Sequence, residues 1–99
     1  MRVVFRPLAE QDLDEIDDWI AAHDPARAEA FVQNVRRRCA ILSQFPLIGR
    51  PRDDLAPGIR TLNFDRRVLV AYRIVDERVE IGRILYRGRD VRRLTREPW

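Results

Sequence analysis

The feature that most constrains the fold is the run RVLVAYRIV at residues 67–75, which is apolar at nearly every position. Such a run is typical of a central strand that is covered on both faces of its sheet. Two further β-like runs flank it, at residues 59–64 and 79–87. The segments between them, residues 65–66 and about 76–78, are short enough to be hairpin turns. The C-terminal half is therefore predicted to form a three-stranded antiparallel meander.

The N-terminal segment predicts one strand followed by one helix. Residues 2–6 (RVVFR) are β-branched and aromatic, and Pro7 ends the run, which indicates a first strand. Apolar residues then recur at helical spacing, which predicts a helix over about residues 8–22 with an acidic opposite face. Its apolar positions are Ala9, Leu13, Ile16 and Ile20.

A second helix is predicted to start at Asp24-Pro25, because aspartate is a good N-cap and proline suits the first helical position. It should end near Phe45-Pro46, and the short link to the first helix implies an antiparallel hairpin. Residues 46–58 contain three Pro and two Gly and are expected to form a loop. We therefore expect a single α+β domain over residues 1–99, with the helical hairpin on one face of the sheet, the other face partly open, and a tail at residues 90–99.

The charge of the chain is divided between its two ends. All 19 basic residues are Arg, so lysine-dependent chemistry is excluded. Residues 1–35 carry 3 Arg and 8 Asp or Glu (net −5), whereas residues 36–99 carry 16 Arg and 8 Asp or Glu (net +8). This division suggests a partner that meets the basic side. The single cysteine, Cys39, cannot form an internal disulfide, and no signal peptide or membrane span is visible, which favours a cytoplasmic location.

Five stretches occur in an order that resembles the ParE/RelE superfamily of type II toxins. These stretches are LAEQDLDEIDDWIA, DPARAEAFVQNVRRRCAILSQFP, GRPRDDLAPGIR, VLVAYRI and RILYRGRD. The PIGR and GIR segments lean toward the ParE branch. The resemblance implies a toxin that is neutralised by a cognate ParD-like antitoxin, a ribbon-helix-helix protein, in a hetero-oligomer. It also implies two possible activities: non-catalytic inhibition of DNA gyrase, or, as in RelE, ribosome-dependent cleavage of mRNA.

A ribonuclease would need groups that move protons and groups that stabilise the phosphate. The candidates for this alternative are Arg60, Arg83, Tyr86 and Arg89. Arginine can clamp a phosphate, but arginine and tyrosine are poor bases at neutral pH. The only histidine, His23, falls far along the chain from these residues. Of the two activities that the resemblance implies, we therefore expect the non-catalytic one, inhibition of gyrase. We expect no cofactor, no metal and no contact with a membrane, and contact with DNA only through the antitoxin.

The antitoxin is expected to contact an apolar groove on the helices and a basic end of the sheet. The groove residues would be Ile16, Trp19, Ile20, Phe31 and Val35, although Trp19 could instead belong to the core. Arg60, Arg83 and Arg89 would meet acidic residues of the antitoxin. Strand alternation places Arg83 on the same face as Ile81 and Leu85. A salt bridge from Arg83 or Arg60 to the chain's own helix carboxylates is the alternative.

The last ten residues form an amphiphilic tail. The tail is either a disordered end or a segment that docks on the fold and contributes to toxicity. The residues that would carry the second role are Arg92, Arg93, Leu94, Arg96 and Trp99.

Overall fold

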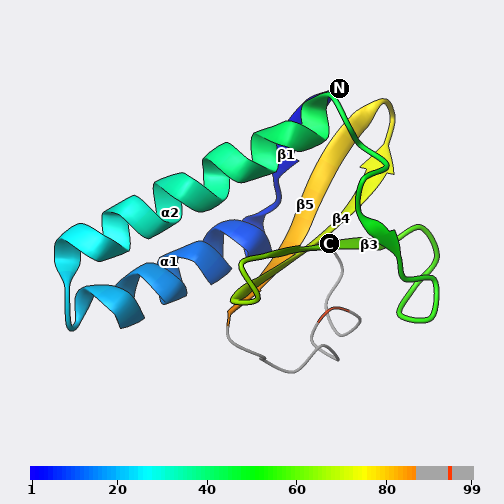
Figure 1. Cartoon of the computed structure of the whole chain (residues 1–99). Coiled ribbons are helices and arrows are strands. Elements are labelled where there is room, and N and C mark those ends of the chain that lie inside the picture. The colour runs from blue at the N-terminus through cyan, green and yellow to red at the C-terminus, as the bar shows by residue number, and fades with distance from the viewer. Residues whose placement is uncertain (87–93, 95–99) are drawn as a thin grey trace.

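The computed structural model describes residues 1–86 and Leu94 (Figure 1). The elements are β1 (Arg2–Phe5), α1 (Pro7–Ala21), α2 (Pro25–Cys39), the 3₁₀ helix η1 (Ala40–Ser43), β2 (Arg50–Pro51), β3 (Arg60–Phe64), β4 (Val68–Val75) and β5 (Arg78–Tyr86). This is the predicted α+β order of strand, helical hairpin and meander. One strand was not predicted: β2 has only two residues and lies within the segment predicted as a loop.

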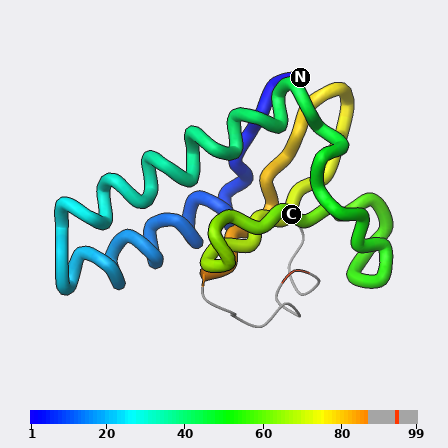
Figure 2. Tube along the Cα trace, viewed as in Figure 1, coloured from blue at the N-terminus to red at the C-terminus, as the bar shows by residue number. Residues whose placement is uncertain are grey.

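The sheet has five strands in the order β1-β5-β4-β3-β2. Strand β1 runs parallel to β5, whereas the other neighbouring pairs are antiparallel. The apolar strand β4 lies at the centre, as its composition predicted. The helical hairpin forms a second layer on one face of the sheet, and the N-terminus lies beside the end of the helical segment (Figure 2). There the N-terminal ammonium donates a hydrogen bond to the Ser43 carbonyl at 2.7 Å.

Local sequence signals set the ends of the helices. Pro7 and Pro25 occupy the first turns of α1 and α2, and the Asp24 side chain caps α2 by accepting from the Arg27 N–H at 3.1 Å. The helical segment continues from Cys39 through η1 to Ser43, close to the predicted end. Neither α1 nor α2, within the described residues, is long and apolar enough to cross a membrane.

The main core lies between the helices and the inner face of the sheet. Leu13, Ile16 and Ile20 of α1 pack with Val35 and Cys39 of α2. They meet alternate strand residues that point toward the helices: Val68, Val70, Tyr72, Val79, Ile81, Ile84 and Tyr86. The apolar faces of both helices are therefore buried in this core.

Both predicted hairpin turns are present and share one conformation. Asp65, Arg66, Asp76 and Glu77 have positive φ angles of 53°, 60°, 48° and 61°. Two successive residues with positive φ define a type I′ turn, whose twist matches that of the strands it joins. The turns therefore set the register of β3, β4 and β5.

The prediction that Arg83 shares a face with Ile81 is wrong. Its shared face with Leu85 is confirmed, because these two residues pair with Ala71 and Leu69 of β4. The pairing of β4 with β5 shifts between Ala71↔Arg83 and Tyr72↔Ile81, so Gly82 is an extra residue in β5. A bulge of this kind interrupts the two-residue alternation of a strand. Ile81 consequently belongs to the core under the helices, whereas Leu85 belongs to a second cluster.

This second cluster lies on the outer face of the sheet. Ala71, Leu85 and Leu94 are its buried members, and Leu55 and Leu69 pack against them. Leu94 is therefore docked on the fold, and the outer face is less open than its size suggested. Arg89, Arg92, Arg93, Arg96 and Trp99, to which the sequence assigned binding or toxicity roles, lie outside the described residues.

Candidate protein-interaction site

Arg83 lies in a buried ion pair with α1. Its Nε and Nη2 donate to the two carboxylate oxygens of Asp12 at 2.8 and 2.9 Å. Asp12 also accepts from the Ile84 N–H at 2.9 Å. Both side chains are almost fully buried. The structure thus has the arrangement that the sequence left as the alternative for Arg83, a salt bridge to a helix carboxylate within the chain.

Arg60 and Tyr72 hold the segment between η1 and β2. Arg60 donates to the carbonyls of Leu47 and Gly49 at 3.2 and 2.8 Å. The Tyr72 hydroxyl donates to the Pro46 carbonyl and accepts from the Gly49 N–H, both at 2.8 Å. Burial raises the pKa of Tyr72, so the hydroxyl keeps its proton for this bond. Both side chains therefore fix the backbone of this segment.

The predicted groove on the helices needs correction. Ile16, Ile20 and Val35 are buried in the main core, because the hairpin uses its apolar stripes against the sheet. Trp19 is 52% exposed, and Phe31 is partly buried. Both rings stand against Tyr86, with centroid separations of 5.8 Å for Trp19 and 5.3 Å for Phe31. Of the five predicted groove residues, Trp19 and Phe31 alone reach the surface.

The four residues of the ribonuclease alternative do not form one described site. Arg60 is opposite Tyr72, which is opposite Ile81. Tyr86 lies five residues further along β5, which corresponds to roughly 15 Å of strand. Arg83 is engaged with Asp12, and Arg89 lies outside the described residues. The described positions therefore do not converge on a single phosphate.

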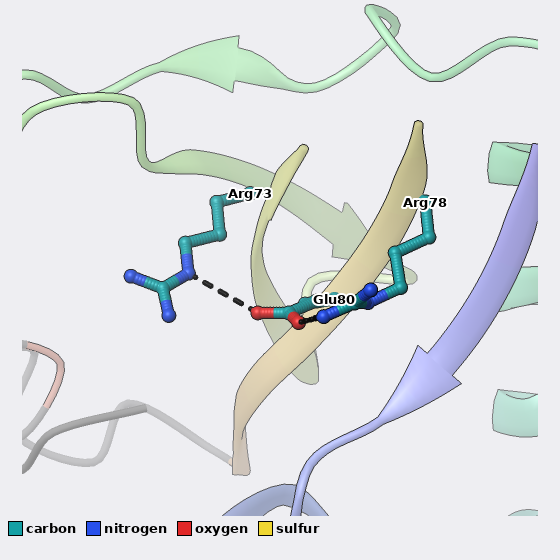
Figure 3. A network of polar contacts seen from close by, with 3 residues as sticks. All are labelled: Arg73, Arg78 and Glu80. Carbon is teal, nitrogen blue, oxygen red and sulfur yellow. Dashed lines mark hydrogen bonds and ion pairs between the residues drawn. The ribbon is translucent and has the colours of Figure 1, made fainter. Parts of the chain in front are cut away.

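The outer face of the sheet carries a charged group around Glu80 on β5 (Figure 3). Arg78 donates to Glu80 at 2.8 and 3.1 Å, and Arg73 of β4 donates to it at 3.4 Å. Burial raises the pKa of Glu80, but the hydrogen bonds and positive charges of these arginines and of Arg6 outweigh it, so the net pKa is lowered. Glu80 is therefore a structural anion on this face.

Cys39 has the properties of a core residue. It is completely buried, and burial raises the pKa of its thiol to about 12. A thiol with this pKa is not a nucleophile at neutral pH.

An exposed apolar surface, which the sequence interpretation missed, lies at the end of α2. It comprises Ile41, Phe45, Leu47 and Ile48, which are 42%, 55%, 64% and 50% exposed. A groove of about 400 Å³ adjoins it, lined by Arg37, Arg38, Ile41, Ile48, Leu62, Asn63 and Phe64. We call these four apolar residues and the groove the α2–β3 surface. Its sequence signal was the apolar FPLI at residues 45–48, inside a segment rich in Pro and Gly.

Two arginines of α2 frame this groove. Arg38 pairs with Asp65 at 2.6 Å, and its guanidinium lies 4.5 Å from the centroid of the Phe64 ring. Arg37 is exposed and donates to the neutral Asn34 side chain at 2.9 Å. The groove therefore combines an apolar floor, formed by its hydrophobic lining residues, with one positively charged wall, formed by Arg37 and Arg38.

The fold is α+β of the RelE/ParE-like class, and its α2–β3 surface is apolar and basic. The family described as "ParE toxin of type II toxin-antitoxin system, parDE" matches residues 3–91. The chain belongs to this family.

A solved structure supports the same assignment. The chain is similar to one from the chromosomal ParDE toxin–antitoxin system of P. aeruginosa, with 28% identity and a TM-score of 0.76. The likeness covers 89% of this chain and 97% of that one. The search of curated proteins gives no match.

Proposed function

We propose that this ParE-family toxin acts in the cytoplasm by binding DNA gyrase and is neutralised by a cognate ParD-like antitoxin. The family match over residues 3–91 carries this proposal. The antitoxin would be a ribbon-helix-helix protein encoded by the neighbouring gene, and the two chains would form a hetero-oligomer. Contact with DNA would occur through the antitoxin.

Inhibition by binding is favoured over mRNA cleavage by the placement of the candidate catalytic groups. The Arg83 guanidinium is buried against Asp12, and the Arg60 guanidinium is bonded to backbone carbonyls. Neither arrangement presents the charge to an RNA phosphate. Trp19, which is half exposed beside Tyr86, remains a proposed antitoxin contact, and Arg89 and the tail residues remain proposals from the sequence.

Two assays on the purified chain separate the activities. We expect inhibition of the supercoiling reaction of gyrase and no cleavage of mRNA in a translation extract. Addition of the antitoxin should restore supercoiling. Position-specific cleavage of mRNA that disappears in Tyr86→Phe would instead establish the RelE-like activity, and full supercoiling at saturating toxin would exclude gyrase as the target.

A further inference from the structure

The α2–β3 surface presents large apolar side chains on a fixed backbone. The Phe45 N–H donates to the Ile41 carbonyl at 2.9 Å, and the Ile48 N–H donates to the Phe45 carbonyl at 3.2 Å. Tyr72 and Arg60 hold the carbonyls of Pro46, Leu47 and Gly49 from beneath. The polar backbone is thus bonded inward, while the side chains of Phe45, Leu47 and Ile48 are at least half exposed. A surface that is ordered in advance loses little conformational entropy on binding.

The charge of the groove indicates the chemistry of its occupant. Both charged residues that line it, Arg37 and Arg38, are basic. Asp65 offsets part of this charge through its pair with Arg38. An occupant with an apolar stripe and neighbouring carboxylates would complement both the floor and the wall.

We propose that the α2–β3 surface binds an acidic amphipathic helix of the antitoxin; this inference rests on the proposed function. A contiguous exposed apolar surface promotes unspecific association in a free protein. A toxin that is held by its antitoxin from synthesis onward keeps such a surface covered. An intermittent contact with the target would leave the surface uncovered for most of the protein's lifetime. Trp19 does not line this groove. It packs against Tyr86, which lies two strands away from the groove residue Phe64 in the same cross-strand row.

The apolar part is tested with Phe45→Ser/Ile48→Ser in the full-length chain. The cognate antitoxin is titrated by calorimetry into wild-type and variant toxin. Loss of two hot-spot side chains should weaken binding by about 100-fold or more. The melting temperature should stay close to the wild-type value, because both side chains are half exposed.

The charged part is tested with a matched pair on one helix. Arg37→Glu should weaken antitoxin binding by about 10-fold at low salt, and the difference should shrink as salt increases. Arg27→Glu, equally a charge reversal at an exposed position of α2 but at its other end, should change binding by less than about 2-fold.

Two results would overturn the inference. Phe45→Ser/Ile48→Ser that binds antitoxin as tightly as wild type would show that the antitoxin does not use this surface. If that variant also loses gyrase inhibition, the surface belongs to the target instead. Failure of the wild-type chain to bind antitoxin at all would refute the proposed pairing itself, and the inference with it.

Discussion

Arg83→Ala should lower the free energy of unfolding by about 3–5 kcal/mol, because it leaves the buried Asp12 carboxylate without its counter-charge. A loss of this size is comparable to the whole stability of many small domains. Urea denaturation followed by circular dichroism would measure it. Arg37→Ala, an exposed arginine on α2, is the control and should change stability by less than about 0.5 kcal/mol.

The same variant separates a structural role of Arg83 from a role in binding. If Arg83 acts within the fold, Asp12→Leu/Arg83→Met should recover much of the stability that Arg83→Ala loses, because it removes both buried charges. Unchanged stability in Arg83→Ala, together with weaker antitoxin binding, would contradict the geometry of the Asp12 pair and restore Arg83 to the binding surface.

Gly49→Ala should lower the free energy of unfolding by about 2–3 kcal/mol, because a methyl group at this position would overlap the Tyr72 ring. An added Cβ would lie 2.5 Å from Oη and 2.6 Å from Cε1 of Tyr72. Tyr72 is fully buried and cannot swing away, so the segment must move and lose the 2.8 Å bond between the Gly49 N–H and the Tyr72 hydroxyl. The shift of the unfolding midpoint in urea would report the loss.

Tyr72→Phe is the matched control for that variant. It removes the hydroxyl and its two hydrogen bonds without adding any atom near Gly49. It should lower the free energy of unfolding by about 1–2 kcal/mol. In the double variant the closest atom of the overlap is gone, so the two losses should not add. Full additivity, or a Gly49→Ala protein as stable as wild type, would show that the segment is not held against Tyr72.

Most of the architecture could be predicted because its signals are local. The Asp24-Pro25 pair marks the start of α2, and the composition of residues 67–75 marks the central strand. The two-residue β2 carries no readable pattern, because it is too short for a period to repeat. The bulge at Gly82 was missed for a different reason: it depends on how β5 pairs with β4, which one strand's sequence does not reveal.

The candidate site was harder to predict than the fold, because apolar helical residues serve a core and a binding groove equally well. Packing against the sheet buries Ile16, Ile20 and Val35 in the core. The exposed Phe45, Leu47 and Ile48 lie instead in a segment whose proline and glycine content masked them as an ordinary loop. The bonds from Tyr72 and Arg60, which the sequence does not reveal, hold this segment in one shape.

The measurement that tests the central claim most directly is bacterial growth after induced expression of this chain, alone and with its cognate antitoxin. A ParE-type toxin should arrest growth and replication when expressed alone, and co-expression of the antitoxin should restore growth. Normal growth with the folded chain accumulating alone would contradict the account, and would identify a family member that is not toxic.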